Sequence, residues 1–318
     1  MRKLYFFPQK NLLISLPLIL IFALVFGMYV DTSMLKSTTL IATMIMIYPT
    51  MVGIQWKSLL NLSEKKLFSF AFMVNFILIP LIAFFLGKTF LINEPIMFAG
   101  LVLIALLPTS GMTISWTSIS GGNVPAAVKL TVFGLITGAI LAPFYLLVIV
   151  GQVVDIKLIS IMRTILVVVF IPLILGGLTT VWLKRRFSQP VIRKKIKPSL
   201  QPISIWAMLY IIFSSVSMRS EIIANNLSMI GISIVVLIIF YLLLFMFVTL
   251  LAKRFFQRED ALSFVYGTSL RNLSIAMGVS ATTFGIEATL LITIAFIVQQ
   301  QGVVLYNRLL VPKIFKKA

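Results

Sequence analysis

The sequence predicts an all-helical integral membrane protein with about ten membrane-spanning helices, and three observations support this fold class. Of the 318 residues, 60% are hydrophobic and only 11% are charged, whereas roughly a quarter of a soluble chain is charged. Long continuous apolar runs recur along the chain, which favours spanning helices over the alternating strands of a barrel. Lysines and arginines gather in alternate connections between these runs, except that the short connections after the fourth and ninth runs carry none; the positive-inside rule predicts such an alternation for a multi-pass protein.

Ten apolar segments are separated by charged or turn-forming residues. The first follows a basic, aromatic N-terminus and has no small-residue cleavage site. Because it is about 20 residues long, it is expected to be a membrane helix rather than a secretory signal. The ten segments comprise residues 11–30, 37–54, 67–87, 95–119, 123–149, 158–183, 198–218, 227–252, 261–285 and 288–307.

The basic residues predict the orientation of these segments. Of the 27 lysines and arginines, twenty fall on one face of the membrane, four on the other and three within the segments. The heaviest run, from Lys184 to Lys197, lies on the richer face. Both termini are therefore expected in the cytoplasm and the protein in the plasma membrane. The net charge of +19 is expected to set topology and to contact anionic headgroups, not nucleic acid.

The arrangement of the segments predicts two halves of opposite orientation. Five segments precede the connection at residues 151–157, and five follow it. Because five is an odd number, residues 1–152 and 153–318 should lie in the membrane inverted relative to each other. We expect these halves to form a single domain.

Two segments at matching positions of the halves carry polar interruptions. The fourth contains a proline, a glycine and a run of hydroxyls between Pro108 and Thr117, and the ninth contains glycine, hydroxyls, a cation and an amide between Gly267 and Ser274. Proline removes a backbone hydrogen bond and glycine loosens the helix. Such residues also serve as contacts between membrane helices. Matched interruptions in inverted halves, however, indicate the binding site of a secondary transporter.

The charges near these interruptions favour an anionic ligand. Helices that restart near Met112 and Leu273 present unpaired amides, which attract anions. Arg271 adds a full charge near mid-membrane, where a cation costs roughly 3 kcal/mol or more. All eight acids fall in loops or at segment edges, so either an anionic ligand or opened backbone carbonyls should neutralise Arg271. Arg163 is expected to reach the membrane surface; Lys129 either does so or lies in a polar interior.

Two further polar features belong to the candidate site. Asn75 precedes Pro80 in the middle of the third segment, and it either lines the site or bonds backbone freed by Pro80. The run Gln299–Gln301 lies in the last segment; three consecutive helical residues cannot face one way, so at least one should bond between helices. The predicted substrate-binding residues are Asn75, Thr109, Ser110, Thr113, Ser269, Arg271, Asn272 and Gln299.

The composition excludes several function classes. The chain has no cysteine and no histidine, which rules out disulfides, thiolate or imidazole chemistry and the usual zinc or haem ligands. We expect no cofactor, no metal site and no catalytic residue. An intramembrane enzyme is disfavoured because such enzymes use acids, histidines or metals at membrane depth. A channel is disfavoured because the sequence shows no charge ring or repeated filter motif.

The interrupted segments also resemble a known superfamily. The stretch from Pro108 to Trp116, continuing to Gly122 and Asn123, is similar to the fourth span of arsenical-resistance permeases. The stretch from Arg271 to Ala276 resembles the ninth span of both those permeases and the bile acid:sodium symporters. Asn75 before Pro80 is similar to the permeases' third span. The resemblance implies a panel and a core domain, with the fourth and ninth helices crossing where they unwind, and transport by alternating access.

The departures from the family pattern shape the predicted function. The functional cysteine of the arsenical permeases falls at Thr109, and their ninth-span glutamate at Ser274. An arsenic site built on a thiolate is therefore not expected. Arsenite or antimonite efflux without a cysteine stays an alternative.

The comparison with the sodium symporters concerns the coupling ion. Their ninth-span acid falls near Gly267, an asparagine near Ile114 and a glutamine near Arg271, while Thr113 and Thr131 keep hydroxyls suited to their sodium site. We predict that the Arg271 guanidinium takes the place of the coupling ion, and that a small organic anion or oxyanion is moved without sodium. Sodium-coupled symport is the remaining alternative.

Overall fold

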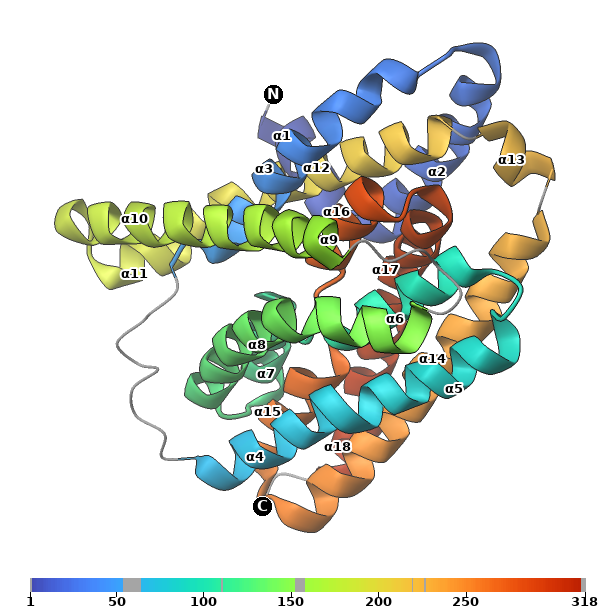
Figure 1. Ribbon diagram of the computed structural model, residues 1–318. Coiled ribbons are helices and arrows are strands. Elements are labelled where there is room, and N and C mark those ends of the chain that lie inside the picture. Colours follow the sequence, from blue (N-terminus) through green and yellow to red (C-terminus); the bar gives the residue numbers. More distant parts are fainter. Residues whose placement is uncertain are drawn as a thin grey trace. The chain divides into compact units, whose positions relative to one another are not determined.

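The computed structural model describes residues 2–53, 64–109, 111–151, 158–218, 220–225 and 227–315 (Figure 1). These residues are helical throughout, apart from connections and one isolated bridge between Pro108 and Arg271. Packing divides the chain into two compact units. Unit 1 comprises Met1–Ile54, Lys157–Ile230 and Ser274–Thr293; unit 2 comprises Gln55–Ile156, Gly231–Leu273 and Ile294–Ala318.

Unit 1 is a bundle built around the helix α12. This helix packs against α2 and α3, and α3 also packs against α10. Two glycines permit close approach: Gly27 lies against the backbone of Ser217, and Gly176 against Met51. The elements are α1 (Arg2–Lys10), α2 (Leu12–Tyr29), η1 (Ser33–Thr38), α3 (Thr39–Met51), α9 (Leu158–Ile165), α10 (Ile171–Arg186), α11 (Gln189–Val191), α12 (Lys197–Ser217), α13 (Ser220–Asn225), most of α16 (Leu273–Thr283) and the start of α17 (Ile286–Leu305).

Unit 2 is built around α8, which packs against α6, α7 and α15. Gly134 and Gly138, one turn apart on α8, face the stretch Leu106–Thr109, the small-residue spacing that lets membrane helices approach closely. The helices are α4 (Lys65–Met73), α5 (Ile79–Phe90), α6 (Pro95–Leu106), α7 (Gly111–Ser120), α8 (Val124–Val150), most of α14 (Leu227–Phe255), α15 (Arg258–Ser269), the end of α17 and α18 (Val311–Ile314).

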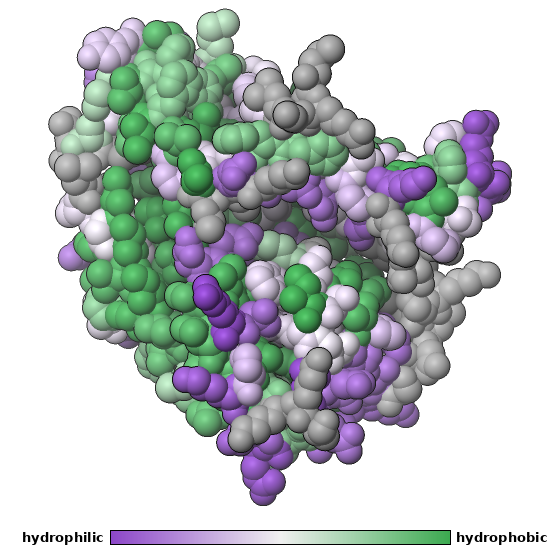
Figure 2. Space-filling view, turned by 180° about the vertical axis from the view of Figure 1, so that it is seen from behind, coloured by the Kyte–Doolittle hydropathy of each residue, from purple (hydrophilic) through white to green (hydrophobic). Residues whose placement is uncertain are grey.

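The predicted membrane class is confirmed in its coarse form. Every predicted apolar segment overlaps a helix, and many large hydrophobic side chains are exposed, as on the face shown in Figure 2. The number of ten spans stays a prediction. Among the described residues, six helices are long and apolar enough to cross a bilayer: Lys65–Phe90, Val124–Val150, Met162–Arg186, Lys197–Ser217, Ser228–Phe255 and Ile286–Ile314. Four shorter apolar helices are Ile14–Tyr29, Thr39–Met51, Pro95–Leu106 and Leu273–Thr283.

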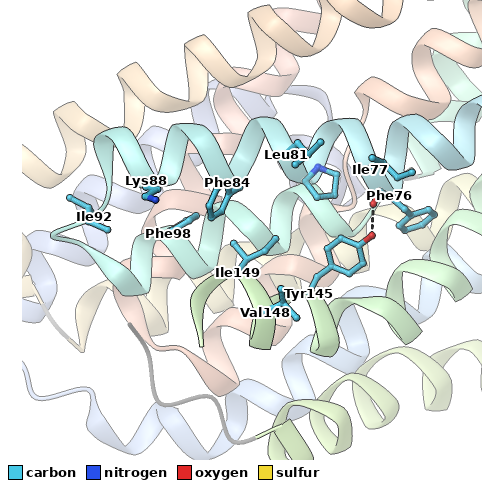
Figure 3. A pocket seen from close by; sticks show the side chains of 11 residues that line it. Phe76, Ile77, Leu81, Phe84, Lys88, Ile92, Phe98, Tyr145, Val148 and Ile149 are labelled. Atoms are coloured by element: carbon cyan, nitrogen blue, oxygen red, sulfur yellow. Dashed lines mark hydrogen bonds between the residues drawn. The ribbon is translucent and has the colours of Figure 1, made fainter. Parts of the chain in front are cut away.

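Four prolines follow short π-helical segments, whereas Pro143 of α8 and Pro202 of α12 lie inside α-helices. Each segment is followed, two residues later, by a proline that cannot donate to the carbonyl four residues earlier. In the third predicted segment, Pro80 frees the carbonyl of Phe76, which instead accepts a hydrogen bond from the Tyr145 hydroxyl (Figure 3). The segments are η3 (Val74–Leu78), η4 (Leu166–Phe170), η5 (Ile192–Ile196) and η6 (Tyr306–Leu310), before Pro80, Pro172, Pro198 and Pro312.

The close packing of α8 predicts the effect of one added methyl group. In Gly138→Ala, the new Cβ would lie 2.6 Å from the Leu106 carbonyl oxygen and 3.0 Å from Pro108 Cδ. Because backbone cannot yield as a side chain can, we expect a loss of about 1–3 kcal/mol and a lower Tm in detergent. Gly231→Ala on α14 is the matched control, since its Cβ meets nothing within 4 Å. Equal Tm values for Gly138→Ala and the wild type would contradict this packing.

Candidate functional site

The two polar interruptions predicted from the sequence meet in unit 2. Helix α6 ends at Leu106 and α7 begins at Gly111, while α15 ends at Ser269 and α16 begins at Leu273. The Thr109 N–H donates to the Leu270 carbonyl at 2.9 Å, and the Asn272 N–H donates to the Leu107 carbonyl at 2.7 Å. These bonds form the antiparallel bridge between Pro108 and Arg271. Backbone opened in one helix is therefore satisfied by backbone opened in the other.

Thr109 holds the first interruption in a strained conformation. Its φ of 58° is the only positive φ at a non-glycine residue in the described part of the chain, and a β-branched residue seldom adopts this region. The side chain is fully buried, and its hydroxyl donates to the carbonyls of Pro108 (2.7 Å) and Thr131 (3.2 Å). Together with the bridge, these contacts fix the strained turn.

Arg271 is fully buried where the two interruptions meet. Nε donates to the Ile104 carbonyl at 3.1 Å, Nη1 to the Thr268 carbonyl at 2.9 Å, and Nη2 to the Ala105 carbonyl. Nη1 also donates to Asn75 Oδ1 at 2.6 Å. The guanidinium is thus surrounded by oxygen atoms that carry no full charge.

These acceptors belong to two helix C-termini. Ile104 and Ala105 lie in the last turn of α6, and Thr268 lies in the last turn of α15. The last carbonyls of a helix lack intrahelical donors and carry the negative end of its dipole. Arg271 therefore caps both helix ends with one buried cation. Of the two partners expected for this charge, an anionic ligand or opened carbonyls, the carbonyls occupy its donors in this conformation.

Asn75 and Gln299 complete the shell around Arg271. Asn75 accepts from the guanidinium and donates through Nδ2 to the Gly267 carbonyl at 3.4 Å; the carbonyl freed by Pro80 is bound by Tyr145 instead. Gln299 Oε1 accepts from the Arg271 N–H at 2.7 Å, and its Nε2 donates to the Arg271 carbonyl at 3.4 Å. The Gln299 amide thereby satisfies both backbone groups of Arg271, as the backbone of a neighbouring β-strand would.

The three consecutive glutamines face different surroundings, as the helical period predicted. Gln299 is fully buried, and it also accepts from the Tyr241 hydroxyl at 3.0 Å. Gln300 is half-buried and donates to the Met112 sulfur at 2.8 Å. Gln301 is exposed. Gln299 is the glutamine that bonds between helices at the interruptions.

The other predicted site residues surround the bridge with varied contacts. The Thr113 hydroxyl donates to the Tyr266 carbonyl at 3.2 Å, and the Thr131 hydroxyl to the Ala127 carbonyl at 2.8 Å, so both hydroxyls serve helix carbonyls. Asn272 is 9% exposed. Ser269 is fully buried, and its Oγ has no hydrogen-bond partner among the described residues. Ser110 lies outside the described residues.

Comparison with known proteins assigns the chain to a family. A model of the Sodium Bile acid symporter family matches residues 40–226, more than half of the chain. The chain belongs to this family. It is 23% identical over 299 residues to the arsenical-resistance protein Acr3 of Corynebacterium glutamicum, an alignment that covers 85% of this chain and 80% of that protein.

Two further relatives have the same level of similarity. Over 244 residues the chain is 24% identical to the protein YbaS of Bacillus subtilis, covering 76% of this chain and 77% of that one. Over 230 residues it is 26% identical to sodium/bile acid cotransporter 7 of Xenopus tropicalis, covering 70% of this chain and 65% of that one. The predicted superfamily is confirmed, and this bile acid symporter family member is a multi-pass membrane transporter.

The sequence analysis missed a buried ion pair in this symporter family member. Lys129 on α8 is 5% exposed, and its Nζ lies 2.8 Å from Glu64 Oε2 just before α4. Lys129 is therefore paired with an acid, and this contact does not decide between the two interpretations of Lys129. The sequence did contain a signal: Glu64 and Lys129 both lie close to the predicted cytoplasmic ends of their segments, so a pairing at that depth could have been anticipated.

A polar cluster was also missed. The Tyr266 hydroxyl lies 2.7 Å from Ser120 Oγ and donates to Asn307 Oδ1 at 2.9 Å. Next to it, Arg258 donates to the carbonyls of Ser120 (2.9 Å) and Gly121 (3.1 Å) at the end of α7. Arg258 is thus a second arginine that caps a helix C-terminus in this family member, away from the interruptions.

Proposed function

We propose that this protein is a secondary transporter that moves a small organic anion or oxyanion across the plasma membrane by alternating access, without coupling to sodium. The observation that carries the proposal is the cap of Arg271 on the C-termini of α6 and α15. In transporters with broken helices, opened carbonyls and half-helix C-termini coordinate the coupling cation. In this protein, the Arg271 guanidinium donates hydrogen bonds to carbonyl oxygens of that kind.

The geometry argues against a sodium ion beside Arg271. Sodium needs several oxygen ligands, and the carbonyls of Ile104, Ala105 and Thr268 already accept from the guanidinium. A second cation would also be repelled. At a separation of about 4 Å and an effective dielectric constant of about 20, two unit charges repel by roughly 4 kcal/mol. That energy corresponds to a weakening of sodium binding by about three orders of magnitude.

The two helices that begin after the interruptions favour the binding of an anion at their N-termini. Helices α7 and α16 begin directly after the bridge, at Gly111 and Leu273, and helix N-termini attract negative charge. We assign substrate contact to Thr109, Ser110, Thr113, Ser269 and Asn272. The Oγ of Ser269 supports this assignment, because it has no partner in the described part of the chain, and a buried hydroxyl without one is costly unless a ligand uses it.

Asn75 and Gln299 each hydrogen-bond to Arg271 in this conformation. We infer that they position the interruptions and that Arg271 acts on the substrate through its field. Transport would then require the two capped helix ends to move as one body. This proposed role differs from the direct substrate contact that the sequence analysis predicted for these three residues.

We further propose the ten-span topology with both termini in the cytoplasm, with residues 1–152 and 153–318 as inverted repeats of one transporter domain. The distribution of twenty cations against four on the two faces supports this topology. The meeting of the two interruptions, one from each half, supports the repeat.

Arsenite or antimonite efflux is the second candidate function, favoured by the similarity to Acr3 over 85% of this chain. Against it stands Thr109, which offers a hydroxyl where a thiolate would bind trivalent arsenic. The same experiment separates this candidate from the first.

The test is uptake into proteoliposomes that contain the purified protein, with sodium present or replaced by choline. The panel comprises bile acids, short keto and hydroxy acids, arsenite and antimonite. We expect saturable uptake and counterflow of an organic anion at equal rates in both media. Saturable stimulation by sodium would overturn the sodium-independent mechanism, and movement of arsenite alone would favour efflux of metalloids. Uptake without counterflow would indicate a channel.

A further inference from the structure

A groove on unit 2 runs along α5 (Figure 3). It has a volume of about 570 Å³ and is bounded by η3 and α5, by Phe98 of α6 and by the C-terminal part of α8. Its walls are mainly aromatic and aliphatic, with Phe76 and Tyr145 at one end and Lys88 towards the other.

The groove contains one cation and otherwise apolar walls. The Tyr145 hydroxyl is already used, because it donates to the Phe76 carbonyl. Lys88 is exposed, its Nζ lies 5.8 Å from the centre of the Phe84 ring, and no acidic side chain of the described residues forms an ion pair with it. The groove is therefore matched to an amphipathic ligand with a long apolar part and a negative group at one end.

The length of the groove matches one leaflet of a bilayer. Ile77 precedes Lys88 by eleven residues, which at about 1.5 Å per residue is roughly 16 Å. The hydrocarbon core of a membrane is about 30 Å thick, so the groove extends across about half of it. Lys88 lies in the last turn of α5, which ends at Phe90. Its ammonium group is thus placed where the headgroups begin.

The groove is also open along its side. Ile77 is 53% exposed, Leu81 47% and Val148 78%, so a ligand can enter laterally from the hydrocarbon phase. We propose that the groove binds an acyl chain of an anionic phospholipid, with the headgroup phosphate on Lys88. The lipid would pack against Phe76, which follows Asn75, the residue that holds the Arg271 guanidinium.

The proposal does not depend on the transported substrate. Purified full-length protein in detergent is incubated with a photoactivatable phosphatidylglycerol or with a photoactivatable phosphatidylcholine of the same chains, and labelled peptides are identified by mass spectrometry. We expect phosphatidylglycerol to label α5 and the end of α8 in preference. Lys88→Gln should reduce this labelling about fivefold and reduce phosphatidylcholine labelling less, because choline offsets the charge of its phosphate. Leu81→Trp, which fills the groove, should reduce labelling by both lipids.

Two control variants keep the test specific. Lys253→Gln removes an exposed cation at the end of α14, and Phe85→Trp enlarges a side chain that is 63% exposed on α5 but does not line the groove. Both should label like the wild type. Labelling spread evenly over the surface, or unchanged in Lys88→Gln and Leu81→Trp, would overturn the proposal. So would preferential labelling of the groove by a photoactivatable bile acid, because the occupant would then be a solute.

Discussion

Replacement of Arg271 by alanine is expected to abolish sodium-independent uptake and to create a response to sodium. The variant leaves the carbonyls of Ile104, Ala105 and Thr268 buried without the guanidinium that now donates to them. Each buried acceptor without a donor costs about 1–3 kcal/mol, so we expect these three to cost about 3–9 kcal/mol in total. Because the freed oxygens lie at two helix C-termini, they form a site with negative potential that a small cation can fill.

The sodium response of Arg271→Ala is measured as Tm and as uptake, in sodium and in choline media. Sodium should raise the Tm of the variant and restore part of its uptake, while both quantities stay the same in the wild type. Arg271→Lys should have an intermediate stability, because a single ammonium keeps the charge but cannot reproduce the planar set of donors.

Arg258→Ala is the matched control for Arg271→Ala. Arg258 also donates to carbonyls at a helix end, those of Ser120, the last residue of α7, and of Gly121, which follows it, but it lies apart from the interruptions. Its loss should lower the Tm without any effect of sodium. If sodium leaves both variants unchanged, the guanidinium does not occupy the place of a coupling ion.

Much of the local structure could be predicted because it depends on neighbouring residues. Continuous apolar runs specify helices in a bilayer, where backbone groups must be satisfied within the segment. Proline and glycine mark where this rule fails: the fourth segment opens around Pro108, and its second part begins at Gly111, close to the expected Met112. The expected restart near Leu273 agrees with the start of α16. No acid lies within the apolar segments, so backbone carbonyls were one of the two partners expected for Arg271.

The partners within the site could not be predicted, because they join residues far apart in the sequence. The bridge between Pro108 and Arg271 and the contact of Asn75 with the guanidinium arise from packing in unit 2. The positive φ of Thr109 opposes its own conformational preference. It is stable only because the bridge and two buried carbonyls hold it. No single segment contains that information.

Gln299→Leu is expected to have the second-largest effect, because it removes the support of the ninth-segment interruption. The Arg271 N–H and the Tyr241 hydroxyl would both lose their acceptor in a fully buried position. At about 1–3 kcal/mol for each unsatisfied group, the loss is about 2–6 kcal/mol. The Arg271 carbonyl keeps a donor, the Leu273 N–H at 3.0 Å. We expect a lower Tm and a strong loss of uptake.

Three further variants separate the role of the Gln299 amide from general packing. Gln301→Leu makes the same change at an exposed position on α17 and should stay within about 0.5 kcal/mol of the wild type. Tyr241→Phe removes one donor but leaves the bond from the Arg271 N–H intact, so its loss should be about 1 kcal/mol. Gln299→Glu keeps both acceptor contacts and places a carboxylate near the buried guanidinium, so its uptake should exceed that of Gln299→Leu. If Gln299→Leu instead matches Gln301→Leu in both Tm and uptake, the opened backbone does not need the amide, and the bridge to Pro108 alone maintains the interruption.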